Sequence, residues 1–256
     1  MKYKFTIICF AALAILASCN KKNEPETVGT VNDICGNTYK YVKIGEQYWM
    51  AENMRCNKYD TKSERAGATI STSSSSTYDP YYTDASNRSN WKTTQYSWNL
   101  SDEQISKLGY LYSWAAAVGI ASESAAKNQT SSFSGTRQGI CPNGWHVPTS
   151  KEWESIGRLG DNNPRIGGMY TTTGELLKTT SGWTRNNGND IYSFAALPTG
   201  YATGSTVNNV GGSAHFWITD PHGSNDAFYS SLSTDSYLSV WYRDKSNAYS
   251  VRCVKN

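Results

Sequence analysis

The chain has few of the residues that most active sites and nucleic-acid surfaces require. Only 18% of its 256 residues are charged, and only three are histidine. After the first 18 residues no lysine/arginine cluster remains, which argues against nucleic acid as a partner. The cysteines form no CxxC pair and no histidine lies near them in the sequence, so a zinc site is not expected. No convincing acid–base set is present either, and we expect no enzymatic activity.

The chain also lacks an apolar run long enough to cross a bilayer. Its longest run, Phe5 to Ala17, is about 13 residues, short of the ~20 that a membrane-spanning helix needs. A run of this length after a basic start is typical of an export signal. It ends in Leu16-Ala17-Ser18-Cys19, which matches the bacterial lipobox. The small residues admit the peptidase, and the Cys19 thiol accepts the lipid.

We therefore predict a lipoprotein signal peptide over residues 1–18, a lipidated tether over 19–30 and one domain over 31–256. The alternative is an ordinary secretory signal in which Cys19 is merely a nearby thiol; the polar Asn20-Lys21-Lys22 favours lipidation. Asn20 also argues against retention in the inner membrane, so the outer membrane is the expected location. No acidic run after Cys19 marks surface export, which leaves the periplasmic and outer faces both open.

Four cysteines remain after the signal and the lipidated residue: Cys35, Cys56, Cys141 and Cys253. In an exported chain they favour two disulfides, with three alternative pairings, over free buried thiols. Cys35 and Cys56 flank a predicted hairpin over 39–50, which makes a local bridge between them plausible.

The remaining composition, rich in Gly, Tyr, Trp, Ser and Asn, predicts short strands and polar loops. Capping-box patterns predict helices that begin after Ser101 and Thr149, the second with Trp153, Ile156 and Gly157 on one face. A short helix is expected around 174–178, a buried strand or helix start at 110–118, and strands and turns from 191 onward. Eight of the nine residues from Thr69 to Thr77 are Ser or Thr. We expect the segment 57–100 to be a polar insertion with little to bury.

Several sequence blocks occur in an order that matches a known family. They are IGEQYWMAENM (44–54), GYLYSWAAA (109–117), ICPNGWHVPTSKEWESI (140–156), FAALPTGY (194–201), HFWIT (215–219) and SVRCV (250–254). Together they resemble the Fibrobacter succinogenes major paralogous (FISUMP) domain, over residues 29–256. That family occurs in exported, often lipid-anchored proteins of Bacteroidota. The GWHVPT-xxEW block also looks like its counterpart in the formylglycine-generating enzyme group, which has a C-type-lectin-like fold.

The resemblance implies an α+β, C-type-lectin-like domain with short helices flanking twisted antiparallel sheets, many loops and paired termini. It also implies a disulfide between Cys141 and Cys253. The chain departs from the family in having Cys35 where an acidic residue is usual, and in the length of 57–100. The copper chemistry of the formylglycine-forming enzymes is not carried over, because the cysteines here are better explained as disulfides.

The candidate ligand-binding residues are aromatic and lie outside the shared blocks: Trp91, Trp98, Trp241 and Tyr242. Exposed aromatic rings stack on sugars or anchor protein partners; the alternative is that they plug the edges of a loop-rich fold. A weaker calcium candidate is Asn187, Asn189 and Asp190, whose oxygens suit Ca²⁺ but whose composition is also that of a plain turn. The lectin calcium tripeptides Glu-Pro-Asn, Gln-Pro-Asp and Trp-Asn-Asp are absent.

The sequence thus predicts a lipid-anchored cell-envelope module that binds glycan or protein, without a cofactor unless calcium serves as one. The alternatives are a structural or assembly component of a fimbria-like appendage, and an envelope enzyme.

Overall fold

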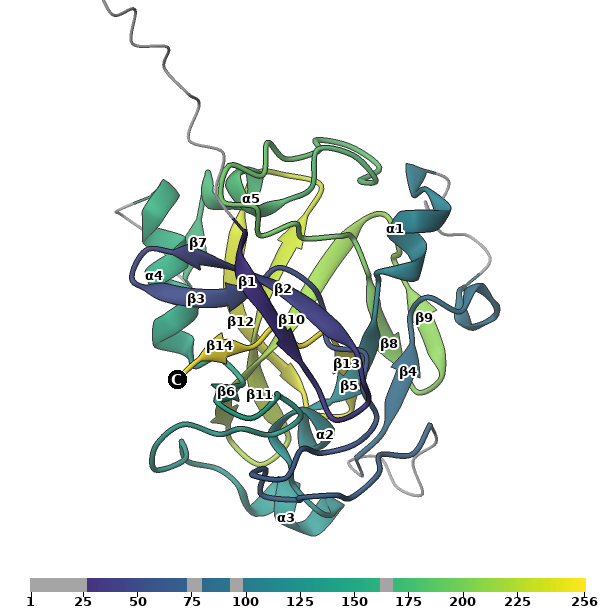
Figure 1. Cartoon of the computed structure of the whole chain (residues 1–256), viewed down its shortest axis with the longest axis vertical. Helices are drawn as coiled ribbons and strands as arrows, with labels where there is room; N and C mark the ends of the chain where they lie inside the picture. Colours follow the sequence, from purple (N-terminus) through teal and green to yellow (C-terminus); the bar gives the residue numbers. More distant parts are fainter. Residues whose placement is uncertain (1–26, 73–79, 93–98, 162–167) are drawn as a thin grey trace, which may run out of the picture.

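The computed structural model describes residues 27–72, 80–92, 99–161 and 168–256, and these form three antiparallel sheets with short helices around them (Figure 1). The first sheet has the order β1 (Thr27–Asn32), β2 (Thr38–Ile44), β3 (Gln47–Met50), β14 (Val254–Lys255), β6 (Trp145–His146). The second has the order β10 (Ser213–His222), β11 (Asp226–Ser233), β12 (Leu238–Asp244), β7 (Met169–Tyr170). The third has the order β4 (Tyr82–Asp84), β5 (Tyr110–Ser113), β13 (Asn247–Tyr249), β8 (Tyr201–Thr203), β9 (Thr206–Asn208).

The helices are η1 (Arg88–Asn90), α1 (Asp102–Ser106), α2 (Trp114–Val118), α3 (Glu123–Asn128), α4 (Ser150–Gly160) and α5 (Thr173–Leu177). The predicted α+β class is confirmed. Every helix in the described ranges is too short or too polar to span a membrane.

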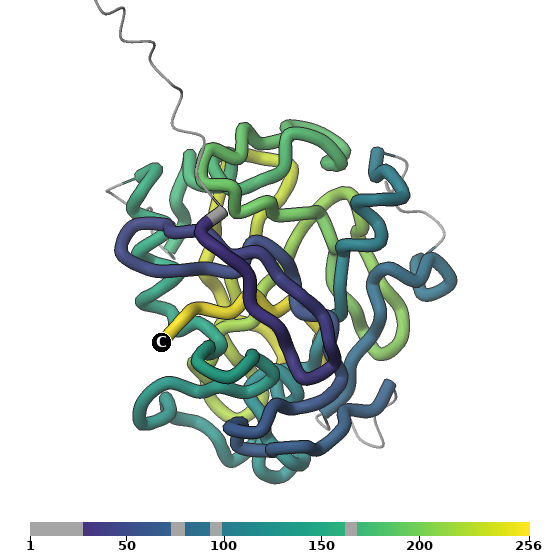
Figure 2. Tube along the Cα trace, in the orientation of Figure 1, coloured from purple at the N-terminus to yellow at the C-terminus, as the bar shows by residue number. Residues whose placement is uncertain are grey.

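The first sheet brings the two ends of the domain together. The predicted hairpin forms as β2 and β3, with Ile44 opposite Gln47 across a turn in which Gly45 has a φ of +60°. Val254 of β14 then pairs with Trp49 of the hairpin and with His146 of β6. Figure 2 shows this last strand, in yellow, lying beside the purple hairpin. The C-terminal strand therefore lies in the same sheet as β1, but the two are separated by the hairpin and do not pair with each other.

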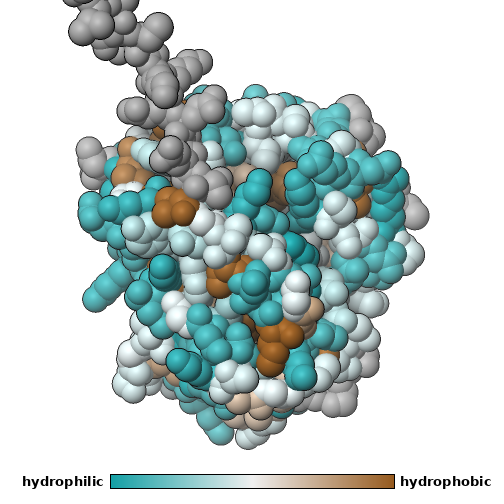
Figure 3. Space-filling view, in the orientation of Figure 1, coloured by the Kyte–Doolittle hydropathy of each residue, from teal (hydrophilic) through white to brown (hydrophobic). Residues whose placement is uncertain are grey.

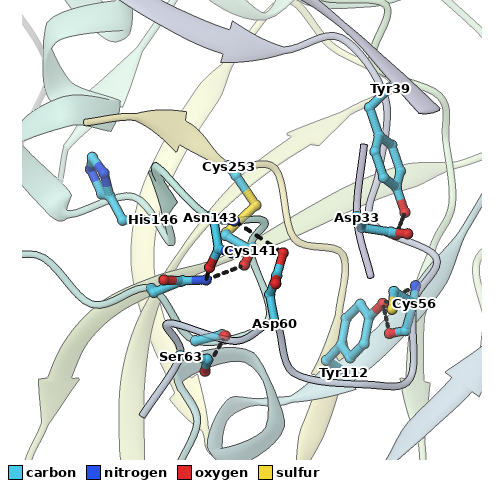
Figure 4. The surroundings of a disulfide bond; sticks show 12 residues. Asp33, Tyr39, Cys56, Asp60, Ser63, Tyr112, Cys141, Asn143, His146 and Cys253 are labelled. Carbon is cyan, nitrogen blue, oxygen red and sulfur yellow. Dashed lines mark hydrogen bonds between the residues drawn. A yellow bond between two sulfur atoms is a disulfide. The ribbon is translucent and has the colours of Figure 1, made fainter. Parts of the chain in front are cut away.

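Two disulfides close this arrangement, and both match the predictions. Cys35 bonds to Cys56 around the hairpin, and Cys141 bonds to Cys253. Figure 4 shows the second bridge joining the segment before β6 to the segment before β14, with the His146 ring pointing away from it. The hairpin, β6 and β14 are thus held covalently as well as by strand pairing.

Both predicted capping boxes are formed. Ser101 and Gln104 cap α1 reciprocally, and Thr149 and Glu152 cap α4. The predicted inner face of α4 is buried, and its Trp153 packs against Trp49, Phe194 and Phe216. This packing covers one face of the second sheet.

The segment 57–100 buries more than its composition suggests. Among its described residues, large or apolar side chains are buried at several positions, including Tyr59, Ile70, Tyr81, Tyr82, Ala85 and Leu100. The Tyr59 hydroxyl donates a hydrogen bond to the Ala116 carbonyl at 2.9 Å, and β4 is hydrogen-bonded to β5 in the third sheet. The expectation of little burial is wrong for the described part, because widely spaced large side chains enter the core between the polar ones. Residues 73–79 and 93–98 lie outside the described ranges.

Candidate functional site

A row of aromatic side chains crosses the second sheet from the core to solvent. The strand register places Trp217 of β10 opposite Tyr229 of β11, and Tyr229 opposite Trp241 of β12. Their exposed fractions rise along the row, from 0% for Trp217 through 8% for Tyr229 to 44% for Trp241. The inner end is anchored, because the Trp217 indole N–H donates to the Tyr112 carbonyl at 2.7 Å. Trp241 is therefore the exposed end of an aromatic row whose inner end is buried and fixed by a hydrogen bond.

A second group of rings meets Trp241 at the same place. Tyr242 lies nearly parallel to Trp241, with ring centroids 5.3 Å apart and an interplanar angle of 14°. The exposed His222 ring stacks on Tyr242 at 3.7 Å and 10°, and Phe228 lies edge-on to both. We call His222, Phe228, Trp241 and Tyr242 the aromatic edge.

In the described ranges, the strand that carries Trp241 and Tyr242 is paired along only part of one side. β7 pairs with β12 only at Leu238 and Ser239, followed by one bond from the Val240 N–H to the Gly168 carbonyl. Within the described ranges no strand pairs with this side of β12 beyond Val240.

The sequence-predicted aromatic residues fall into three groups. Trp241 and Tyr242 come together: although neighbouring residues of a strand leave it on opposite faces, their rings stack with centroids 5.3 Å apart. Trp91 lies elsewhere, beside Val207 of β9, where its indole N–H donates to the Ala85 carbonyl at 2.8 Å and its ring packs on buried side chains. Trp91 thus seals a sheet edge, which is the alternative that the sequence left open. Trp98 lies outside the described residues.

Sequence reasoning missed His222 and Phe228 as members of the site. The register puts Phe228 directly opposite Tyr242, and His222 reaches the cluster from the end of β10. The signal was available in the two aromatic-rich strands that the sequence predicts. However, the cross-strand partners depend on the register, which a single residue of slip would change.

His215 belongs to the same sheet face and stays uncharged there. Its ring lies against those of Tyr201, Tyr229 and Tyr249, at centroid distances of 5.1 to 5.4 Å. Burial lowers the pKa of His215 to about 4, and the positive charge of Arg243 acts in the same direction. At neutral pH this residue is therefore part of an aromatic wall and not a cationic group.

A second feature of the surface is a set of three hollows along the segment 175–197. One, of about 390 Å³, is lined by Glu175, Lys178, Asn186, Asn187, Asp235, Ser236 and Tyr237. Another, of about 540 Å³, is lined by Thr184, Arg185, Asn209, Gly212, Ser233 and Thr234. The third, again about 390 Å³, is lined by Lys40, Ala51, Glu52, Gln104, Lys107, Thr179, Asp190, Ser193, Ala195, Leu197 and Arg252.

Backbone strain concentrates at these hollows. Asn186, Asp190, Ser193, Ala195 and Asn209 have a φ between 48° and 55°, and each lines one of the three. They are the non-glycine residues of the described chain with positive φ. Such conformations cost free energy and often occur where a binding surface must be held in one shape.

The third hollow is held by a buried arginine. Arg252, 1% exposed, donates to the Asn53 side-chain oxygen at 2.7 Å, to the Phe194 carbonyl and to the Ala195 carbonyl at 2.9 Å. These contacts join three of the sequence blocks, 44–54, 194–201 and 250–254. Burial raises the pKa of the nearby Asp190 to about 6, against the lowering effect of backbone N–H groups and of Arg252.

The calcium candidates Asn187, Asn189 and Asp190 lie in the same loop, but their side chains make different hydrogen bonds. The Asn187 side-chain oxygen accepts the Trp183 N–H at 3.0 Å, and the Asp190 carboxylate accepts the Ala195 N–H at 2.8 Å. The Asn189 amide donates towards Glu175 at 3.4 Å. These hydrogen bonds connect the three side chains to other residues of the segment 175–197.

His146, the other histidine of the sequence blocks, is fixed by hydrogen bonds at both ring nitrogens. His146 lies 2.8 Å from Glu152 and 2.6 Å from the Asn256 side chain, through its two ring nitrogens. Burial opposes the charged ring, but the bond to Glu152 and its charge raise the pKa of His146 overall. Glu152 at the same time caps α4, in agreement with its sequence interpretation.

A family model described as the Fibrobacter succinogenes major domain matches residues 42–255. The chain belongs to this family. Neither a curated protein nor a solved structure matches the chain. Membership in the Fibrobacter succinogenes major family indicates a domain of the cell surface or envelope. The match includes the aromatic edge and both ends of the Cys141–Cys253 bridge, whereas β1 and Cys35 precede it.

Proposed function

We propose that this protein is a cell-envelope binding module that holds a glycan at its aromatic edge. The observation that carries the proposal is the parallel stacking of Trp241, Tyr242 and His222, with Trp241 44% exposed. Sugar rings present C–H groups on their faces, and these pack on flat aromatic rings. The ring stack also holds Trp241 in place before binding, which reduces the entropy lost on binding.

Polar groups next to Trp241 suit the hydroxyls of a sugar. Ser231 and Ser239 face each other across β11 and β12, one cross-strand pair away from Tyr229 and Trp241 on the same face of the sheet. Both serines are half-buried. An aromatic platform bordered by hydroxyl groups offers the stacking and hydrogen bonding by which binding sites orient polar ligands.

The side of the molecule that Figure 3 shows, on which β1 and β2 lie, offers no large apolar patch to a protein partner. That surface is mostly hydrophilic, and its hydrophobic spots are separated from one another (Figure 3). Surfaces that bind proteins stably usually present larger contiguous apolar patches.

A glycan array tests this proposal, with the full chain purified in detergent. We expect binding to at least one glycan class, and at least a tenfold loss in Trp241→Ala, because exposed aromatic anchors dominate such contacts. Ile191→Ala is the matched control, since Ile191 is equally exposed, at 46%, on the loop of the hollows. Asp190→Asn probes the third hollow and suits the left-handed backbone there.

The result can contradict the proposal in two ways. Loss in Asp190→Asn with full binding in Trp241→Ala would place the site in the third hollow. The absence of binding to any glycan would contradict the proposal that the aromatic edge binds a glycan. Thermal unfolding of each variant separates either outcome from misfolding.

We further propose that the protein is anchored to the outer membrane through lipid on Cys19. The support is the lipobox Leu16-Ala17-Ser18-Cys19 and the polar residues after it. Several acyl chains on one cysteine hold a protein firmly, whereas one chain gives marginal binding. Cys19→Ser is expected to move the protein from the membrane fraction to the soluble fraction. An unchanged membrane fraction, measured by immunoblot after alkaline washing, would exclude the lipid as the anchor.

We propose the C-type-lectin-like architecture as the finer description of the fold. It is supported by the pairing of β14 with β3 and by the packing of α4 over β10, β11 and β12. An experimental structure compared with lectin-like domains tests it.

An assembly role is the second candidate, and one feature favours it. β1 is an edge strand that pairs with β2 alone in the described part of the chain, and open strand edges accept strands from other chains. Val28 of this strand is 47% exposed. Isolation of cell envelopes after cross-linking tests the idea, since an assembly subunit forms regular higher oligomers and a binding module does not.

A further inference from the structure

The exposed face of β12 carries a cation next to the aromatic platform. Arg243 follows Trp241 by two residues, so both side chains lie on the same face of the strand. Arg243 is exposed, and its charge influences His215 and Tyr249, which belong to that face of the sheet. The guanidinium therefore lies on the side of Trp241, Tyr229 and the two serines.

This arginine has no acidic partner in the parts of the chain that the structure describes. No carboxylate there comes within ion-pair distance of it. The nearest acidic residues by register, Asp226 and Asp244, form a cross-strand pair on the opposite face of β11 and β12. Their charges act on the buried amine of Lys245. Arg243 is thus an exposed cation whose charge is not neutralised by a bonded neighbour.

The spacing fits a single sugar ring with a charged substituent. Two residues along a strand are roughly 7 Å apart, so a ring stacked on Trp241 places a group on its rim within reach of the long Arg243 side chain. A guanidinium binds a carboxylate through two parallel N–H bonds, which gives geometric selectivity as well as charge. Neutral sugars offer Arg243 no comparable group.

We propose that the glycan bound at the aromatic edge is acidic, and that Arg243 binds a sugar carboxylate of the uronic-acid type while Trp241 stacks on the ring. This inference rests on the proposed glycan-binding function. It adds that Trp241 provides affinity for rings in general and that Arg243 selects the charged ones. Ser231 and Ser239 remain available for neutral hydroxyls.

Polygalacturonate and its fully methyl-esterified form provide the test, because they share one backbone and differ in charge. The full chain in detergent should bind the acid form at least tenfold more tightly than the ester. Arg243→Gln should reduce binding of the acid form to the level of the ester. Arg185→Gln is the matched control, since Arg185 is an exposed arginine that lines a different hollow, and it should change nothing.

Three outcomes would overturn the inference. The first is equal binding of both polymers, and the second is an unchanged preference in Arg243→Gln. The third is tighter binding of dextran sulfate than of polygalacturonate, which would assign the anion as a sulfate ester. If the ester binds and Trp241→Ala removes that binding, the glycan-binding function stands and only the acidic preference is wrong. If neither polymer nor any other glycan binds, both proposals fall.

Discussion

Replacing Cys141 and Cys253 together with serine is expected to lower the free energy of unfolding by about 5 kcal/mol. The bridge spans a sequence separation of 112 residues. On the chain-entropy model, a crosslink over such a loop restricts the unfolded chain by about that amount. The bridge adds to noncovalent contacts at the same point, where β14 pairs with β3 and β6 and the buried Arg252 donates hydrogen bonds to three residues. Urea or guanidinium unfolding measures the difference, with the m-value fitted separately for each protein because the crosslink makes the unfolded chain more compact.

The second disulfide is the internal control. The Cys35–Cys56 bridge has a separation of only 21 residues, for which the same model gives about 3 kcal/mol. The double serine variant at Cys35 and Cys56 should therefore lose less stability than the variant at Cys141 and Cys253. The opposite order would show that native contacts around the hairpin, and not chain entropy, set the effect of each bridge.

Lys245→Met is expected to cost about 3 kcal/mol or more of unfolding free energy, because it leaves several buried carbonyl groups without a donor and each such group costs about 1–3 kcal/mol. The Lys245 amine lies 2.9 to 3.0 Å from four backbone carbonyls, those of Ala126, Gln129, Gly223 and Ser224, which share its three N–H donors. It also lies 4.6 Å from the centre of the Trp114 ring. A methionine of similar length fills the space but leaves the four acceptors without their donor.

The pKa of Lys245 shows that its surroundings disfavour the charged form of the amine. Burial lowers the pKa of Lys245 to about 8, although Asp226 and Asp244 act in the other direction. The residue is 1% exposed and ties the end of α3 to the turn between β10 and β11. Lys107→Met is the control, because Lys107 makes one exposed ion pair with Glu103, and such pairs contribute at most about 1 kcal/mol. Similar losses in the two variants would contradict the role assigned to Lys245.

Local features of the fold follow from local sequence. The hairpin of β2 and β3 and the caps of α1 and α4 depend on residues within about twelve positions of one another, so a single segment carries the information. The Cys35–Cys56 bridge belongs to this class as well, because the hairpin brings its cysteines together. The Cys141–Cys253 pairing was reached through the family resemblance and not through spacing.

Long-range features did not follow from the sequence. Lys245 and Arg252 look like surface residues in the sequence, and only the assembled fold surrounds them with carbonyl groups from distant segments. The segment 57–100 was misjudged for the same reason, because Tyr59 and Ile70 enter a core built by other segments. Their position outside the shared blocks singled out Trp241 and Tyr242, whereas the contribution of His222 and Phe228 depends on strand register.

The hollows and the aromatic edge present different kinds of surface to a ligand. The segment 175–197 is strained and polar, whereas the aromatic edge offers flat rings on a support that extends through Tyr229 to the buried Trp217. A rigid support of this kind favours a binding role in which the site changes little on binding.

The most direct test of this account is a calorimetric titration of the best-binding glycan into the full chain and into Trp241→Ala. The account predicts a Kd at least tenfold weaker in Trp241→Ala, with unchanged unfolding behaviour and with Ile191→Ala binding like the parent. An unchanged Kd in Trp241→Ala would contradict the claim that the aromatic edge is the binding site.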